Sequence, residues 1–465
     1  MNADLEALLA LERFAETRLA ELEGTAVHAP GAVDDVRPYL RRRYTFAHAV
    51  PSEVLVEDIW RLMAGDLDST HPRYFGLFNP PTLPITVVAD AVVAILNPQV
   101  GTQTHTPVAN AIEEHVLDAL GERIGYTRGE FGAHFTTGGQ ESNATALASA
   151  LTAKFPEVIR EGVRALPGAP RIYVSEHAHH SFVKAAKFLG LGSRAVREIP
   201  ADVSERMDPD ALEAAVLSDQ DGGHCPLMVV ATAGTTGSGV IDRIPPLRDI
   251  AARHCLWFHV DAAWGGSVLL SERFRGCMDG IADADSVTWD AHKWLDVPMG
   301  AGMVFYRPPN ATAAMFGVTT GYVPQASAVE PYLTTAQWSR RFIGLKVFMA
   351  LSQLGFADYA KLIEHQIALG DYLRSLLRDS EWHITNHTPL PVVCAAAPPD
   401  YSSVSIEQLV RNINESGEAW LSALTQPGGE QVVRICITSY RAQTADIDRL
   451  VMAMNKACRT LNAAG

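Results

Sequence analysis

Short runs of apolar residues alternate with amphipathic segments through the middle of the chain. The apolar runs lie at 171–175, 227–232, 256–260, 286–289 and 301–306, and another ends at 135–137. Continuous apolar runs of this kind are typical of strands buried on both faces of a parallel sheet. Helical patterns occupy 143–154, 180–190 and 247–254 between them. The chain is therefore predicted to form an α/β fold whose mostly parallel sheet is flanked by helices.

The two ends of the chain carry different patterns. Residues 5–22 place leucine and phenylalanine on one side of a predicted helix, and a second helix is expected at 54–67. After residue 358 we expect a helix, then strands at 382–385, 391–396 and 432–438, then a final helix at 445–461. The predicted organisation is an N-terminal helical segment at 1–80, a large domain at 81–350 and a small C-terminal α+β domain at 351–465.

Composition narrows the class of protein. The chain has 465 residues, of which 47% are hydrophobic and 20% charged, as in ordinary globular proteins with more than one core. A net charge of -15 argues against nucleic acid and anionic membrane surfaces as partners. The six cysteines form no CxxC pair, and the sequence has no signal-peptide pattern or membrane-spanning apolar stretch. We therefore expect a cytoplasmic protein with reduced thiols.

One lysine lies in an unusual setting. Lys293 follows a histidine in the stretch 289–295, between Trp289 and Trp294 and directly after a predicted strand. An ammonium group is costly to desolvate, so such a lysine is either a surface residue with a partly buried stem or an amine held at a site. The other lysines considered lie on helices predicted to be exposed: Lys154, Lys184, Lys187, Lys346 and Lys361.

Two further motifs precede this lysine. Asp261 ends a predicted strand and is followed by Ala262 and Ala263, which leave room for a flat ring, although an aspartate there could also cap a helix. Gly138 and Gly139 come just before a predicted helix, where free N–H groups can bind an anion. Paired glycines are also common in ordinary turns, and this motif is not the GxGxxG dinucleotide pattern.

A histidine cluster completes the set of motifs. His177, His179 and His180 lie together after the strand predicted at 171–175. Two histidines one residue apart can bind zinc. The chain offers no third ligand set at a suitable spacing, so we do not expect a metal site.

The order and spacing of these motifs, from about His71 to about Arg441, resemble the group II pyridoxal-phosphate-dependent decarboxylases. That family includes the aromatic-amino-acid, histidine, glutamate and diaminobutyrate decarboxylases. The resemblance implies the aspartate-aminotransferase-like fold (fold type I) and pyridoxal 5'-phosphate as cofactor. It also implies a homodimer with active sites at the interface, in which residues 5–22 pack across the dimer.

The resemblance implies a role for each motif. Lys293 is expected to bind the cofactor aldehyde as an imine, and Asp261 to lie beside the ring nitrogen. His179 is expected to lie flat on the ring, and Thr236 to reach it with its hydroxyl. The full set of expected cofactor contacts is Gly138, Gly139, Gln140, His179, Thr236, Asp261, Ala263, His292 and Lys293.

A tyrosine completes the expected chemistry. Tyr322 lies in the loop 321–330, where the family keeps a mobile-loop tyrosine. After carbon dioxide leaves, the α-carbon must be protonated, and this phenol is the expected donor. Together with Lys293, His179 and Asp261 it makes up the expected catalytic set. The alternative is a tyrosine that merely packs in a surface loop.

The substrate pocket is expected to have two walls. The first includes Leu77 and Phe78, in a loop rich in proline and aromatic residues. The second includes Gln103 and His105, which are polar where a pocket for an aromatic side chain would be apolar. We therefore expect a polar or mid-sized substrate instead of an aromatic one.

The function expected from these observations is decarboxylation of an L-amino acid to an amine and carbon dioxide. One alternative is other chemistry with the same cofactor: oxidative deamination to an aldehyde, transamination or a carbon–carbon lyase reaction. Another is a catalytically silent homologue, which the retention of Lys293, Asp261, His179 and Tyr322 disfavours. The sequence does not identify the amino acid.

Overall fold

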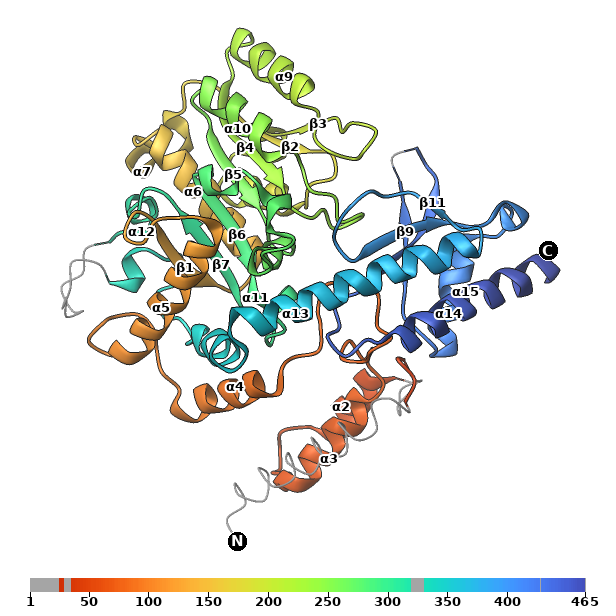
Figure 1. Ribbon diagram of the computed structural model, residues 1–465. Helices are drawn as coiled ribbons and strands as arrows, with labels where there is room; N and C mark the ends of the chain where they lie inside the picture. Colours follow the sequence, from red (N-terminus) through yellow and green to blue (C-terminus); the bar gives the residue numbers. More distant parts are fainter. Residues whose placement is uncertain (1–24, 29–34, 319–329, 427, 465) are drawn as a thin grey trace. The chain divides into compact units, whose positions relative to one another are not determined.

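The computed structural model describes residues 25–28, 35–318, 330–426 and 428–464 (Figure 1). The chain forms two compact units. The larger unit contains residues 78–368 and 386–392, and the smaller contains residues 1–77, 369–385 and 393–465. Tyr322 and the segment 5–22 lie outside the described residues. Among the described helices, none is long and apolar enough to cross a membrane.

The larger unit is built on a seven-stranded sheet with the order β1-β7-β6-β5-β4-β2-β3. The strands are β1 (Gly132–Thr136), β2 (Pro170–Ser175), β3 (Val196–Ile199), β4 (Cys225–Thr232), β5 (Trp257–Asp261), β6 (Ser286–Asp290) and β7 (Gly302–Tyr306). Only β7 runs antiparallel to its neighbours β1 and β6. The pairs β3–β2, β2–β4, β4–β5 and β5–β6 are parallel. This confirms the predicted mostly parallel sheet flanked by helices.

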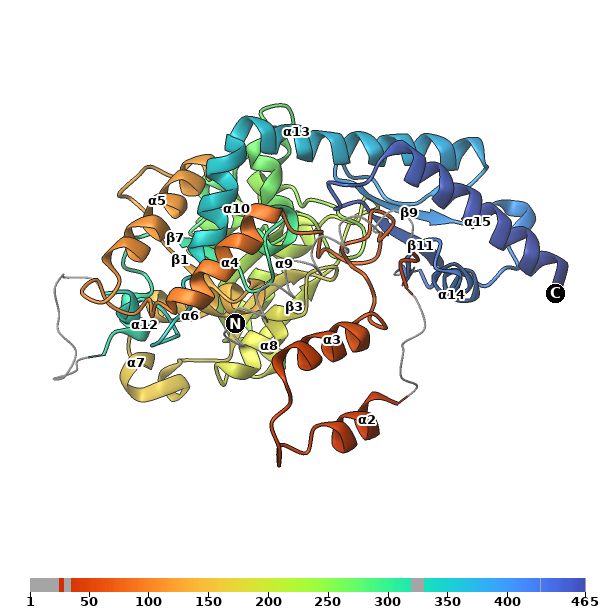
Figure 2. The same ribbon diagram turned by 90° about the horizontal axis from the view of Figure 1, so that it is seen from below.

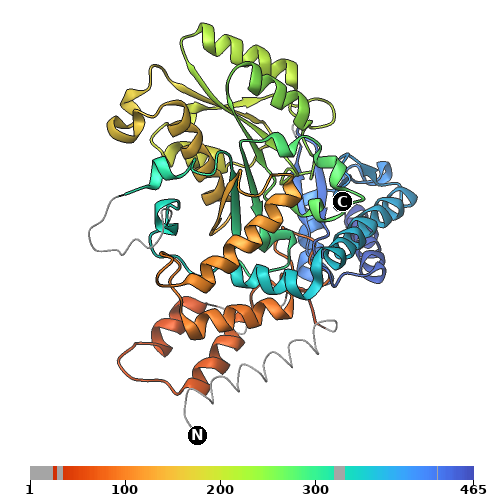
Figure 3. The same cartoon turned by 60° about the vertical axis from the view of Figure 1, so that its left-hand side comes forward.

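Helices cover both faces of this sheet. The helices of the larger unit include α4 (Pro84–Leu96), α5 (Pro107–Ile124), α6 (Gly139–Lys154), α7 (Val158–Glu161), α8 (Ser181–Phe188), α9 (Pro209–Asp221), α10 (Ile244–Arg253), α11 (Ala291–Trp294) and α12 (Ala313–Phe316). Helices α6 and α8 share a buried cluster with Ile172, Val174 and Met228. Because neighbouring side chains on a strand point to opposite faces, Tyr173 faces the other way and donates to Asp219 on α9. Helix α5 packs beside β1 (Figure 3).

A long helix, α13 (Gly344–Asp379), follows the sheet. Its direction changes at Gly355, whose φ of 61° and ψ of 174° are not helical, and the change is visible in Figure 2. Its start is held by Glu113 of α5, whose carboxylate accepts hydrogen bonds from the backbone N–H groups of Ile343 and Gly344. Glu113 also pairs with Arg340, with 2.6 Å between Oε2 and the guanidinium Nη2. A carboxylate here complements the positive end of the helix.

The smaller unit has its own core. Its sheet has the order β10-β11-β9-β8, with β8 (His383–Ile384), β9 (Val392–Ala396), β10 (Ser422–Thr425) and β11 (Gln431–Cys436). Helices α14 (Ile406–Ser416) and α15 (Thr444–Ala464) pack on it through residues such as Leu409, Leu450 and Met454. Near the N-terminus, α2 (Val36–Arg43) and α3 (Ser52–Met63) are joined by Asp58, which accepts hydrogen bonds from Tyr39 and Tyr44. This bonding and the nearby arginines lower the pKa of the Asp58 carboxyl.

Candidate active site

A cavity of about 290 Å³ lies where several strands of the larger unit end. Strands β4, β5 and β6 run parallel and end at Thr232, Asp261 and Asp290, and all three residues line the cavity. The carboxyl edge of such a sheet is where α/β proteins usually bind ligands. Figure 1 shows β4, β5 and β6 side by side in the sheet, and the residues at their ends come from distant parts of the sequence.

Lys293 projects into this cavity from the one-turn helix α11, which directly follows β6. The helix is fixed by its neighbours, because Trp289, Trp294 and Leu295 are fully buried. Trp294 stacks on Trp264, with 4.8 Å between the ring centroids. The side chain of Lys293 is 26% exposed, and its Nζ lies 3.2 Å from Oδ2 of the buried Asp290. Of the two readings of this lysine, the geometry matches an amine held at a site.

The other lysines are placed differently, and one prediction about them was wrong. Lys346 is buried, not exposed, and its amine bonds to Asp90 and to the carbonyl oxygen of Met299. Lys361 pairs with Asp358 on an exposed surface. Lys293 is the lysine that lines the cavity.

The start of helix α6 forms a narrow wall of the cavity. Gly138 has a φ of +156°, and a Cβ there would lie 3.1 Å from Cε1 of His292. A Cβ on Gly139 would lie only 2.8 Å from Oδ2 of Asp290, so a side chain would fill this space. The first turn of a helix has backbone N–H groups without intrahelical partners. The two glycines leave that turn open to a ligand, as an anion site requires. Gln140 follows them and also lines the cavity.

The imidazole of His292 lies beside Gly138 and is a neutral hydrogen-bond donor. Burial lowers the pKa of its imidazole, so the ring is uncharged at neutral pH, although Asp290 opposes this effect. The ring Nδ1 accepts a hydrogen bond from the backbone N–H of Ala301 at 3.1 Å. The proton of the neutral ring is therefore on Nε2. That N–H is available to an anion bound at Gly138.

Asp261 is held by two hydrogen bonds. Its Oδ1 accepts from the backbone N–H of Ala263 at 3.1 Å, and its Oδ2 accepts from the Asn143 amide at 2.8 Å. Ala263, a predicted cofactor contact, also lines the cavity. An acceptor-only carboxylate matches two donors. Asp261 therefore presents a fixed carboxylate to the cavity.

His179 and Thr236 also line the cavity. His179 is exposed at its edge, and its Nδ1 accepts a hydrogen bond from the backbone N–H of Ser181. That bond leaves Nε2 as the protonated nitrogen of a neutral ring. Among the described residues, no three His, Cys, Asp or Glu side chains are grouped in a way that could hold a metal ion.

The predicted substrate residues do not all reach this cavity. Phe78 lines it and packs on Trp264, with 4.8 Å between the ring centroids. Leu77 belongs to the smaller unit and is 56% exposed. The backbone N–H of Gln103 donates to Glu330 and its side-chain amide donates to Glu114, and His105 is exposed. In the described part of the chain, neither Gln103 nor His105 is among the residues that line the cavity.

Six residues that line the cavity were not among the predicted site residues: Thr137, Asn143, Thr232, Gly234, Trp264 and Asp290. Asn143 lies one turn into the helix after Gly139, and Asp290 lies three positions before Lys293. Their closeness to those motifs was the available signal. Thr232 ends a predicted strand as Asp261 does, and the shared edge of parallel strands could have pointed to it.

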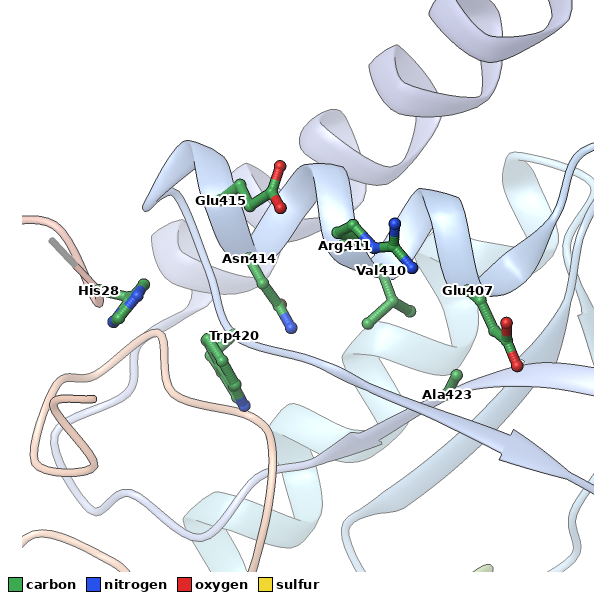
Figure 4. Close-up of a pocket in the computed structure, with 8 residues that line it drawn as sticks. All are labelled: His28, Glu407, Val410, Arg411, Asn414, Glu415, Trp420 and Ala423. Carbon is green, nitrogen blue, oxygen red and sulfur yellow. The ribbon is translucent and has the colours of Figure 1, made fainter. Parts of the chain in front are cut away.

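A second cavity, of about 410 Å³, lies in the smaller unit (Figure 4). It is lined by His28, Glu407, Val410, Arg411, Asn414, Glu415, Trp420 and Ala423. Trp420 meets His28 edge to face, with 5.7 Å between the ring centroids. This cavity contains none of the predicted site residues. The predicted residues that line a cavity therefore lie in the larger unit.

Comparison with known proteins places the chain in a family. The family model described as "Pyridoxal-dependent decarboxylase conserved domain" matches residues 41–397. The cysteine sulfinic acid decarboxylase of Mus musculus is 34% identical over 317 residues, 67% of this chain and 64% of that protein. The L-2,4-diaminobutyrate decarboxylase of Acinetobacter baumannii is 30% identical over 326 residues, 66% of this chain and 64% of that protein. The matched region thus spans a little less than two thirds of these relatives.

Solved structures share the fold. The crystal structure of mouse CSAD has a TM-score of 0.88 and 27% identity, covering 97% of this chain and 99% of that one. The structure of Oryza sativa TDC with PLP and tryptamine has a TM-score of 0.91, covering 99% of each chain. Its identity is 22%, so this likeness concerns the fold alone.

The cavity fits pyridoxal phosphate. The glycine wall at 138–139 and the His292 N–H suit a phosphate, and Asp261 suits a protonated ring nitrogen. Two buried oxygens that line the cavity, Oγ1 of Thr232 and Oδ1 of Asp290, have no hydrogen-bond partner among the described residues. Buried polar atoms normally have partners, and a polar ligand would supply them. The predicted family, fold class and cofactor are thus confirmed: the chain belongs to the pyridoxal-dependent decarboxylase family.

Proposed function

We propose that this protein is a carboxy-lyase that converts an L-amino acid into an amine and carbon dioxide. The observation that carries the proposal is the amine of Lys293, held 3.2 Å from Asp290 in a cavity that also contains Asp261 and the glycine wall. The relatives named above are decarboxylases, which supports the same reaction.

The residues that line the cavity have different proposed roles toward the cofactor. When bound, pyridoxal phosphate supplies an electron-accepting ring for the electron pair that the departing carboxylate leaves on the α-carbon. Lys293 provides the primary amine for covalent attachment, and Asp290 orients it. Asp261 stabilises positive charge on the ring nitrogen. His292 and the first turn of α6 bind the phosphate. Phe78 and Trp264 form an apolar wall that limits the access of water.

Tyr322 is proposed as the proton donor to the α-carbon. The assignment follows from its position 29 residues after Lys293, at the place of the family's loop tyrosine. A phenol that delivers this proton gives the amine as product. The alternatives are oxidative deamination and transamination, in which the α-carbon is not protonated in this way.

The proposed substrate has a polar side chain. The relatives are named for cysteine sulfinic acid and 2,4-diaminobutyrate, and a further human relative, 31% identical, is named acidic amino acid decarboxylase. Within the larger unit, Gln103 and His105 remain the proposed polar residues of the substrate pocket, and Phe78 remains a proposed apolar one. An apolar ring in contact with Gln103 and His105 would form no hydrogen bonds with these polar side chains, whereas a polar side chain of the substrate would.

The proposed assembly is a homodimer in the cytoplasm. Gln103 and His105 are not among the residues lining the cavity within one described chain, and a second copy could supply this wall. The lack of any CxxC pair suits a reducing compartment. Sedimentation of the purified protein tests the assembly, and a monomer with full activity would contradict it.

A substrate panel tests the reaction. Purified protein with added pyridoxal phosphate is incubated with each common amino acid, including cysteine sulfinate and the diamino acids. Carbon dioxide, amine, aldehyde and keto acid are measured in the same sample. We expect equal amounts of carbon dioxide and amine from a polar substrate, and none from Lys293→Ala. Lys361→Ala, which alters an exposed lysine, is the matched control and should retain activity. Keto acid without carbon dioxide would indicate transamination, and aldehyde with carbon dioxide would indicate oxidative deamination.

A further inference from the structure

A line of buried hydrogen bonds runs from the start of strand β5 to Asp261. Nε1 of Trp257 lies 2.8 Å from Oγ of Ser286, and that oxygen lies 2.7 Å from Nδ1 of His259. Nε2 of His259 lies 3.3 Å from Oδ1 of Asn143. Nδ2 of Asn143 lies 2.8 Å from Oδ2 of Asp261. His259, Asn143 and Ser286 are almost completely buried, so water does not compete for these bonds.

The chemistry of the groups fixes the direction of every bond in this line. The indole N–H of Trp257 can only donate, so Ser286 accepts from it. At the other end the Asp261 carboxylate only accepts, so Asn143 donates to it with its amide nitrogen and faces Nε2 of His259 with its oxygen. A neutral imidazole that donates from Nε2 accepts at Nδ1, so the Ser286 hydroxyl donates to Nδ1 of His259.

The charge state of His259 agrees with this direction. Burial lowers the pKa of its imidazole to about 4, and the negative charge of Asp261 only partly opposes the effect. The ring is therefore neutral at neutral pH. A neutral ring has one N–H, as the line of donors requires.

Two more bonds prevent the Asn143 amide from turning over. Oγ1 of Thr288 donates to Oδ1 of Asn143 at 2.7 Å, and Nδ2 of Asn143 bonds to Oγ of Ser181 at 2.8 Å. A rotated amide would place its N–H groups against two donors and its oxygen against the Asp261 carboxylate. Buried polar groups left without partners are costly, so the observed orientation is strongly favoured.

We propose that Asn143 and His259 are positioning residues that hold Asp261 in one rotamer as a hydrogen-bond acceptor for the ring nitrogen of the cofactor. The line ends with the N–H of Asn143 donating to Asp261, and a carboxylate only accepts. The effect reaches the cofactor only through Asp261. This inference rests on the proposed function, because it requires pyridoxal phosphate in the cavity.

A cofactor analogue without the ring nitrogen tests the inference. The two ligands are pyridoxal phosphate and its 1-deaza analogue, in which a C–H group replaces the nitrogen. Their dissociation constants are measured by equilibrium dialysis with apoprotein. Asn143→Ala should weaken binding of pyridoxal phosphate about tenfold or more, as expected for losing a hydrogen bond to a charged group. Binding of the analogue should change by less than about threefold, since it makes no use of Asp261.

Substitutions at His259 make the test specific. In His259→Phe the donor to Asn143 is lost. Binding of pyridoxal phosphate should again weaken more than binding of the analogue, but by less than in Asn143→Ala. In His259→Gln the side-chain amide can still accept and donate, so binding should stay close to that of the wild type. Circular dichroism and thermal unfolding show whether each variant is folded. If Asn143→Ala does not fold, the dissociation constants of His259→Phe and His259→Gln for the two ligands test the inference.

The outcomes separate this inference from the proposed function. An equal loss of affinity for both ligands would reveal a purely structural role and overturn the inference. Unchanged affinity for pyridoxal phosphate in Asn143→Ala and His259→Phe would also overturn it. Failure of the wild-type protein to bind pyridoxal phosphate would instead overturn the proposed function. A selective loss that His259→Gln restores would support the inference.

Discussion

The amine of Lys293 lies 3.2 Å from the carboxylate of Asp290, the residue that ends β6 three positions earlier. Asp290 is almost completely buried, and a Cβ on Gly139 would lie 2.8 Å from its Oδ2. The amine of Lys293 and the glycine wall therefore lie close to the same carboxylate of Asp290. The ion pair holds the Lys293 amine in position in the absence of a ligand.

The ion pair between Asp290 and Lys293 leads to a prediction about the rate at which pyridoxal phosphate attaches to Lys293. Asp290→Ala removes the partner that orients the amine, so pyridoxal phosphate fixed to Lys293 by borohydride in a short reaction should fall about tenfold. Asp290→Asn keeps an oxygen acceptor, so the amount of cofactor fixed to Lys293 should fall less in this variant. Mass spectrometry of the reduced protein measures the labelled fraction. Equal labelling of the wild type and Asp290→Ala would show that the pair does not orient the amine.

A buried ion pair should stabilise the larger unit. Arg340 and Glu113 are 4% and 5% exposed, and their side chains lie 2.6 Å apart. Glu113→Gln keeps the shape but leaves the Arg340 charge unpaired, which should cost about 3–5 kcal/mol of unfolding free energy. The neighbouring Glu114 is exposed, so Glu114→Gln should change stability by about 0.5 kcal/mol or less. Denaturant unfolding of both apoproteins makes the comparison. Equal midpoints would show that the pair contributes little.

The neutral state of His259 predicts a pH dependence of stability. Its pKa falls from 6.5 to about 4 on folding. Between those values the unfolded chain binds a proton and the folded chain does not, so protonation favours unfolding. This contribution is complete above pH 6.5 and is lost as the pH falls towards 4, by at most about 1.4 kcal/mol per pH unit.

The non-titrating variant His259→Gln isolates this effect. Asp242, whose pKa burial raises to about 6, acts in the opposite sense and is present in both proteins. Denaturant midpoints are measured between pH 4 and 7, and the variant should show the weaker decline on acidification. A parallel decline in both proteins would mean that His259 does not titrate in this range.

Tyr322 decides the product in the proposed mechanism. Tyr322→Phe removes the phenolic proton donor and keeps the ring. Loss of carbon dioxide does not require that proton and should persist. Reaction with dissolved dioxygen and water should then give aldehyde, ammonia and hydrogen peroxide in place of much of the amine. Carbon dioxide, amine and aldehyde are measured together, with an oxygen-free sample as control. An amine yield equal to that of the wild type would remove Tyr322 from the mechanism.

The central sheet could be predicted from sequence because its strands are buried on both faces and carry unbroken apolar runs. Strand β3 was missed because Arg197 and Glu198 interrupt its pattern at the edge of the sheet. Strand β10, at the edge of the other sheet, was missed because its four residues are only partly buried or exposed. Edge strands are partly solvated, so hydrophobicity identifies them poorly.

Local motifs revealed much of the site, and long-range partners did not. Lys293, Asp261 and the glycines stand in recognisable stretches, and the cavity gathers them. Asn143, on helix α6, was missed because its partners Thr288 and Asp261 come from strands β6 and β5. Lys346 was read as exposed because its partner, Asp90, lies 256 positions away. Helical periodicity cannot reveal a charge pair formed by the tertiary fold.

Mapping the covalent bond to the cofactor tests the central claim most directly. The purified protein is incubated with pyridoxal phosphate, reduced with borohydride, digested and analysed by mass spectrometry. We predict a phosphopyridoxyl group on the peptide that contains Lys293, and its loss in Lys293→Ala but not in Lys361→Ala. A label confined to other lysines, or no label on a folded protein, would contradict the account.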